Sequence, residues 1–170
     1  MIDLRKVEKS FSHDLAELWT VTYEEAYKEE HTAENIHAYC AENYTVDAAM
    51  DALTNPDIVC KVAFDNHAPV GFYLIKHSEC PVPLDGGSSE LKQIYILADQ
   101  YGSGVGKLLF DDALCCVQEA GRSWIWLSVS DRNLRAQSFY RKLGFSSLGE
   151  GPVFEIGSDR LTSTIMAREI

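Results

Sequence analysis

Glycines alternate with other residues in the segment GSGVGK at residues 102–107. Alternation of this kind removes side chains where a strand turns into a helix, so several main-chain N–H groups can point at one spot. The first turn of a helix also carries a partial positive charge, which favours an anion such as a diphosphate. The segment is therefore a candidate phosphate-binding loop, although glycines in such a turn also serve structure alone.

This loop departs from two widespread nucleotide-binding patterns. A Walker loop needs glycine where the chain has Tyr101 and Ser or Thr where it has Leu108. A dinucleotide-binding GxGxxG loop needs a third glycine at the position of Lys107. The sequence therefore predicts neither of these nucleotide sites.

A second constellation lies further along the chain. Asn133 is followed at fixed intervals by small, aromatic and basic residues, which are Ala136, Phe139, Tyr140, Lys142, Gly144 and Phe145. The spacing predicts a helix that Asn133 caps and Gly144 ends.

Each constellation follows a predicted strand. Residues 90–97 (ELKQIYIL) are β-branched and aromatic and lead into the glycine loop, after which helical spacing runs from Val105 until Gly121 stops it. Residues 124–129 (WIWLSV) form a near-continuous apolar run typical of a buried inner strand. The pattern is strand, loop, helix, then strand and helix again.

The rest of the chain supplies further elements. Residues 2–8 alternate as a strand, and Ser12 is predicted to cap a helix that runs through HDLAELWTVTYEEAY. A second helical stretch begins at Thr32 and ends before Asn55, with an interruption near Asn43. The remaining predictions are a hairpin (58–64 with 70–77), an exposed loop (81–89) and two closing strands (VFEIG and LTSTIMARE).

Composition limits the class of protein. A chain of 170 residues that is 46% hydrophobic is predicted to form one domain with a proper core. We expect a cytoplasmic protein, because no signal peptide and no membrane-spanning run is visible. The five cysteines have neither a CxxC pair nor His spacing, so no zinc or other metal site is predicted. The net charge of -11 disfavours nucleic acid and anionic membrane as partners and favours cationic ones, although a negative surface also simply aids solubility.

Taken together, the two constellations resemble those of the GNAT superfamily of N-acetyltransferases. They read IYI at 94–96, QYGSGVG at 100–106, and N-x-x-A-x-x-F-Y-x-K-x-G-F from Asn133 to Phe145. The resemblance implies one α/β (α+β) GNAT domain over residues 1–170, with a mixed sheet of about seven strands that is splayed in its middle and flanked by helices. The chain departs from the family at Tyr101, where Arg or Gln is usual.

The resemblance also implies a reaction, which is acetyl transfer from acetyl-CoA to a primary amine by direct attack in a ternary complex. Main-chain groups of residues 94–96 would hold pantetheine, and the Ile96 N–H would polarise the thioester oxygen. Asn133 would bond a pantetheine amide and Tyr140 would protonate the leaving sulfur, the alternatives being a plain helix cap and a packing aromatic. The implied cofactor-binding residues are Ile94, Tyr95, Ile96, Tyr101, Gly102, Ser103, Gly104, Val105, Gly106, Lys107, Asn133, Phe139, Tyr140 and Lys142.

The general base is less defined. Glu90 starts the strand before the glycine loop, where similar enzymes often place a carboxylate that works directly or through water. An exposed glutamate at a strand edge is the equal alternative. Glu24 and Glu25, on the first helix, are other carboxylates that would face the amine.

Further features resemble the bacterial spermidine/spermine acetyltransferase branch. They include Tyr23 and Tyr27, the segment IWLSVSDRN and the ending VFEIGSDRLTSTIMAREI, while Ser163 departs from that branch's usual Asp. A polyamine acceptor agrees with the acidic composition, because polyamines are polycations. Another small amine or a peptide N-terminus is an alternative acceptor, and a non-catalytic acyl-CoA-binding module is an alternative function. Many relatives pair as homodimers.

Overall fold

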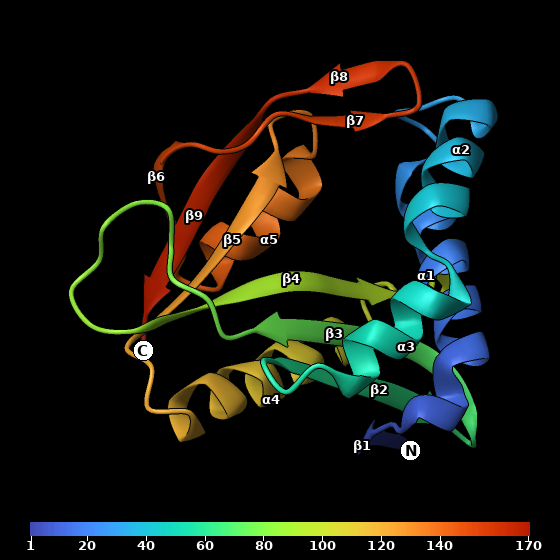
Figure 1. Ribbon diagram of the computed structural model, residues 1–170, viewed down its shortest axis with the longest axis horizontal. Helices are drawn as coiled ribbons and strands as arrows, with labels where there is room; N and C mark the ends of the chain where they lie inside the picture. Colours follow the sequence, from blue (N-terminus) through green and yellow to red (C-terminus); the bar gives the residue numbers. More distant parts are fainter.

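Seven strands form one mixed sheet in the computed structural model, which describes residues 1–170 (Figure 1). In sheet order they are β1 (Ile2–Lys6), β2 (Ile58–Asp65), β3 (Ala68–Lys76), β4 (Ser88–Ile96), β5 (Trp124–Ser130), β9 (Ser163–Glu169) and β6 (Ser146–Glu150). Neighbouring strands pair antiparallel except β4 and β5, which are parallel. The predicted mixed sheet is confirmed.

Helices cover both faces of this sheet. They are α1 (Ser12–Tyr27), α2 (Ala33–Asn43), α3 (Val46–Thr54), α4 (Val105–Glu119) and α5 (Leu134–Lys142), with short 3₁₀ turns η1 (Lys9–Phe11) and η2 (Ala98–Gln100). One hydrophobic cluster packs α1, α2 and α3 against the sheet through residues such as Leu15 and Phe72. The other packs α4 and α5 through residues such as Phe110 and Phe145. Burial of each such side chain contributes roughly 1.5–3 kcal/mol, so each face of the sheet holds its helices firmly.

Side-chain caps define the starts of several helices. The hydroxyls of Thr32 and Thr45 accept hydrogen bonds from the N–H groups of Asn35 and Ala48, which confirms the predicted start at Thr32 and places the interruption near Asn43. The predicted Ser12 cap is wrong. Ser12 lies inside the first turn of α1 because η1 leads directly into that helix, and no side chain caps it.

The C-terminal third holds strands beyond the two predicted. The predicted strand VFEIG is confirmed as β7 (Phe154–Ile156), which pairs with β8 (Asp159–Leu161) in a separate two-stranded sheet, while β6 and β8 were not predicted. In Figure 1 this hairpin extends from the β9 side of the molecule toward α2. The predicted strand LTSTIMARE is confirmed as β9 from Ser163, and its first residue, Leu161, is the last residue of β8.

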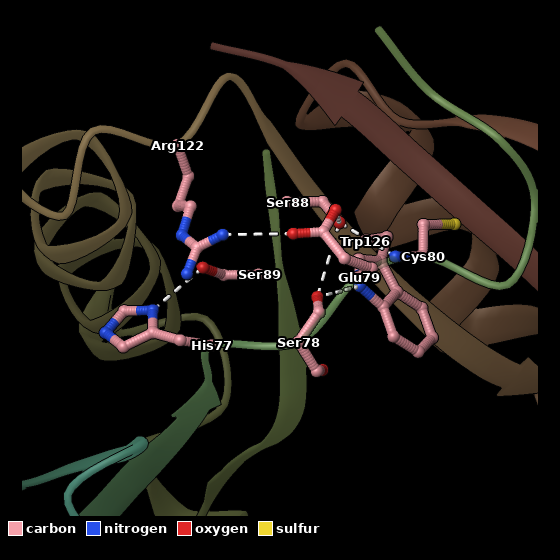
Figure 2. Close-up of polar contacts among 8 residues, drawn as sticks. All are labelled: His77, Ser78, Glu79, Cys80, Ser88, Ser89, Arg122 and Trp126. Atoms are coloured by element: carbon pink, nitrogen blue, oxygen red, sulfur yellow. Dashed lines mark hydrogen bonds and ion pairs between the residues drawn. The ribbon is translucent and has the colours of Figure 1, made fainter. Parts of the chain in front are cut away.

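Polar contacts anchor the long loop between β3 and β4 (Figure 2). Ser88, fully buried, accepts a hydrogen bond from the Cys80 N–H at 2.8 Å, and His77 Nδ1 lies 2.9 Å from the Ser89 hydroxyl. Ser88 and Ser89 belong to β4, so the loop ends before them. Ser89 is also fully buried, and its contact with His77 therefore supports the loop rather than meeting a substrate.

No helix of this fold combines the length and the apolar character that crossing a membrane requires.

Candidate active site

Strands β4 and β5 separate soon after they meet. They pair at Ser88 with Trp124, Ser89 with Ile125 and Glu90 with Trp126, and then diverge although both strands continue. Figure 1 shows this divergence at the centre of the sheet. A cleft of about 650 Å³ lies there, lined by both strands, α1, the glycine loop and α5.

The glycine loop presents free main-chain N–H groups at one end of the cleft. Gly102 and Gly104 adopt left-handed φ angles of 78° and 93°, which glycine reaches without strain. Within the chain, the N–H groups of Gly104, Gly106 and Lys107 have no hydrogen-bond partner. Because these groups lie at the N-terminus of α4, the loop fits an anionic group.

Two cations lie beside the loop. Lys107 is exposed and pairs with Asp111. Arg135, which was not predicted from the sequence, lines the cleft, and its guanidinium carbon lies 4.2 Å from the centre of the Tyr101 ring. The guanidinium of Arg135 on α5 thus lies over the ring of Tyr101 beside the loop.

Asn133 and Tyr140 project from α5 into the cleft. The Asn133 side-chain oxygen accepts a hydrogen bond from the Ala136 N–H at 3.0 Å, which confirms the predicted cap, while Nδ2 donates to the Tyr27 hydroxyl at 3.4 Å. Burial raises the pKa of Tyr140, and the nearby Tyr27 adds to that rise. Tyr140 therefore keeps its proton at neutral pH.

Tyrosines line the other end of the cleft. They come from α1, α2, β4 and the residue that ends α2, and they are Tyr23, Tyr27, Tyr39, Tyr44 and Tyr95. Burial is the main cause that raises the pKa of each of them, so all five hydroxyls stay neutral. We call this group the tyrosine chamber.

The structure brings most of the predicted cofactor-binding residues to the cleft. Those in its lining are Ile94, Tyr95, Ile96, Tyr101, Gly102, Gly104, Gly106, Lys107, Asn133, Phe139 and Tyr140.

Other predicted residues lie outside the lining. Val105 is buried under the loop, the Ser103 hydroxyl is used within the loop on the Gln100 carbonyl at 2.6 Å, and Lys142 is exposed at the last residue of α5. Glu90 lies where β4 and β5 still pair, before the strands open. Glu25 accepts a hydrogen bond from the Ala98 N–H at 2.6 Å and so supports η2 instead of facing the cleft.

The lining of the cleft has a distinctive charge pattern. It includes the cations Lys92, Lys107 and Arg135 but no aspartate, glutamate or histidine side chain. No carboxylate in the lining is therefore available as a base.

Comparison with known proteins relates this architecture to characterised folds. A profile of the Acetyltransferase (GNAT) family matches residues 12–145. An uncharacterized N-acetyltransferase of Mycobacterium tuberculosis is 27% identical over 137 residues, covering 81% of this chain and 83% of the relative. The peptidyl-lysine N-acetyltransferase YjaB of Salmonella typhimurium is 28% identical over 93 residues, covering 55% of this chain and 53% of the relative.

Solved structures share the fold over the whole chain. The PaiA N-acetyltransferase of Thermoplasma acidophilum, crystallised in complex with coenzyme A, matches with a TM-score of 0.82, covering 100% of this chain and 99% of its own, at 21% identity. At this identity the likeness establishes the fold.

Proposed function

This chain belongs to the acetyltransferase (GNAT) family and is an acetyl-CoA-dependent N-acetyltransferase, and we propose that its acceptor is a primary amine of a polycation, a polyamine such as spermidine or spermine. The observation that carries the proposal is a single cleft with an anion-binding loop at one end and neutral tyrosines at the other. The loop matches an anionic thioester substrate, and the neutral aromatic surface matches the aliphatic segment of an amine.

The loop end fits acetyl-CoA. The free N–H groups of Gly104, Gly106 and Lys107 would bind the diphosphate, and the guanidinium of Arg135 would add charge beside it. Beyond Glu90, the edge of β4 that faces the cleft has no strand partner. Its main-chain groups around Ile94 and Ile96 are therefore free to hold the pantetheine arm.

Acetyl-CoA supplies the thioester. The chain would position it, polarise its carbonyl oxygen and protonate its sulfur. The Ile96 N–H would polarise the thioester oxygen. Tyr140, kept protonated by burial, would donate its proton to the departing sulfur. Asn133 would fix the pantetheine arm through its side-chain amide, of which only the nitrogen remains to donate.

Acidic residues beyond the tyrosine chamber support a polycationic acceptor. Glu30, which follows α1, is exposed and close enough to raise the pKa values of Tyr23 and Tyr27. Glu24 and Glu34 are exposed on α1 and α2. A polyamine would place its reacting amine among the tyrosines and its distal ammonium groups near these carboxylates, in line with the net charge of -11.

A lysine side chain in a peptide is the second candidate acceptor. The relative YjaB is named for peptidyl-lysine acetylation, and a lysine ends in the same kind of aliphatic primary amine as a polyamine. A peptide differs because it carries a backbone in place of distal ammonium groups.

Thiol release from acetyl-CoA tests the proposal. The panel contains spermidine, spermine, a lysine-containing peptide, a free amino acid and butylamine, each compared with acetyl-CoA alone. We expect the highest kcat/KM with spermidine or spermine. A preference for the peptide would favour the second candidate, and no release above background with bound acetyl-CoA would favour a non-catalytic acyl-CoA-binding module.

A further inference from the structure

The aromatic rings of the tyrosine chamber pack against one another. The Tyr23 ring stacks on Tyr39, with centroids 4.7 Å apart and planes at 13°. The same ring contacts Tyr27 at 4.5 Å and Tyr44 edge-on at 5.4 Å. Because each ring is held by others, the chamber needs no rearrangement to receive a ligand.

Hydrogen bonds fix the Tyr27 hydroxyl between two elements across the chamber. Its oxygen lies 3.2 Å from the Tyr95 hydroxyl on β4 and 3.4 Å from Asn133 Nδ2 on α5. Since the Asn133 oxygen is committed to the Ala136 N–H, its nitrogen must be the donor to Tyr27. Either hydroxyl of the Tyr27–Tyr95 pair can donate to the other. In the arrangement in which Tyr27 donates to Tyr95, the Tyr27 oxygen keeps one lone pair for a ligand.

Charged groups near Tyr27 belong to several elements, and none of them is an acid in the cleft. Glu30 lies beyond the end of α1, and Arg135 lies on α5. His31 is buried behind the chamber, with its ring 6.0 Å from that of Tyr27 and its Nδ1 2.6 Å from Asp159 on β8. Its Nε2 has no hydrogen-bond partner, but His31 does not line the cleft.

We propose that this enzyme uses no side-chain general base, and that the tyrosine chamber takes the acceptor as the uncharged amine, with an N–H of that amine donating to the Tyr27 oxygen. This inference rests on the proposed function. An ammonium entering the chamber loses its hydration and finds no carboxylate in the lining, so binding favours the neutral form. The substrate class is an amine on an aliphatic segment, held by aromatic faces.

The proton balance needs no acceptor on the enzyme. The ammonium gives one proton to water before it enters. The neutral nitrogen then forms a bond to the acetyl carbon, the carbon–sulfur bond breaks, and nitrogen loses a second proton. The second nitrogen proton passes to water. Tyr140 donates a proton to sulfur and is reprotonated from solvent, so the products are an amide and a thiol.

The pH dependence of kcat/KM tests this directly. The accepted amine is compared with a fluorinated analogue whose primary amine is less basic, on the full-length wild-type enzyme. Below the pKa of each amine, kcat/KM should rise about tenfold per pH unit, and the break should move with the amine. A break at the same pH for both amines would show a titrating group on the enzyme and overturn the inference.

Variants of the candidate residues test whether the enzyme holds a titrating base. His31→Gln and Glu90→Gln should leave the profile unchanged, and loss of a break in either variant would assign the base to that residue and overturn the inference. Tyr27→Phe should lower kcat/KM for the amine about tenfold with the KM for acetyl-CoA unchanged. An unaltered kcat/KM in Tyr27→Phe would also overturn the inference.

Tyr73→Phe is the matched control for Tyr27→Phe. Tyr73 also loses a buried, hydrogen-bonded hydroxyl, which donates to Asp112 at 2.6 Å, but it does not line the cleft. Its kcat/KM should match that of the wild type, and an equal loss would assign the effect of Tyr27→Phe to general packing and overturn the inference. Absence of turnover with every amine would instead refute the proposed function itself.

Discussion

The Tyr140 hydroxyl lies in the cleft lining and keeps its proton because burial raises its pKa. Tyr140→Phe removes this donor and preserves the ring. We expect turnover to fall about 10²–10⁴-fold, the range of general acid catalysis, with the affinity for acetyl-CoA nearly intact. Thiol release measures the first quantity and calorimetric titration the second. Unchanged turnover would mean that another group protonates the sulfur.

Arg135 is the second residue with a measurable role. Arg135→Ala removes the guanidinium that lies over Tyr101 beside the free N–H groups of the loop. A charge-assisted contact contributes about 1.5–3 kcal/mol, so acetyl-CoA affinity should fall about tenfold or more. Arg132→Ala is the control, because Arg132 is another exposed arginine close in sequence that does not line the cleft. Equal losses in both variants would point to net charge alone.

Short sequence motifs predicted those site residues that depend on local backbone conformation. The glycine loop and the Asn133 cap depend on φ angles and helix starts, which short sequence segments encode. Arg135 escaped notice because an exposed arginine on a helix has no local signature, and its contact with Tyr101 is made only in the folded chain. Glu90 was placed on the correct strand, but the point at which β4 leaves β5 is set by the tertiary structure.

Among the elements, the β7–β8 hairpin is docked by Ile156 and Leu161, which are buried in the cluster of α1, α2 and α3, and by polar contacts. His31 bonds Asp159, and the Asn35 side chain contacts Ser158 at 3.2 Å. The hairpin contributes Phe154 to the cleft, so its docking closes the acceptor end. In Figure 1 this hairpin reaches from the side of β6 and β9 to α2.

The Asp159 contact is expected to depend on pH. Its hydrogen bond with His31, and then that with Asn35, lower the pKa of Asp159. A lowered carboxyl pKa gives stability above the ordinary value of about 4, and that stability is lost as pH falls through the folded value. Relative to the amides of β9, amide hydrogen exchange in β7 and β8 should therefore accelerate below about pH 4.

Asp159→Asn should produce the same acceleration at neutral pH, with β9 as the internal reference. Equal exchange in the variant and the wild type would show that Asn35 and packing hold the hairpin without this contact.

Strand prediction failed where the local pattern was weak. The sequence of β6, SSLGE, has no alternation of apolar and polar residues, and its strand character comes from pairing with β9. The helices and the β2–β3 hairpin were predictable because amphipathic spacing and turn residues such as Asn66 and His67, both left-handed, define them locally.

At the scale of the whole molecule, the net negative charge acts oppositely on the two proposed substrates. A chain of net charge -11 repels the anionic acetyl-CoA, and the free amides with Lys107 and Arg135 offset that repulsion locally. The same net charge attracts a polycation toward the exposed carboxylates near the tyrosine chamber. Screening by salt should therefore act oppositely on the two substrates.

This opposition gives a prediction that needs no variant. Between about 0.05 M and about 0.5 M sodium chloride, where the screening length shortens severalfold, kcat/KM for spermidine should fall, while that for butylamine should change little because it has no distal ammonium group. The KM for acetyl-CoA should not rise in parallel, since screening also weakens its repulsion. Equal responses of spermidine and butylamine would mean that the surface carboxylates do not contribute to binding, and that the chamber alone selects the amine.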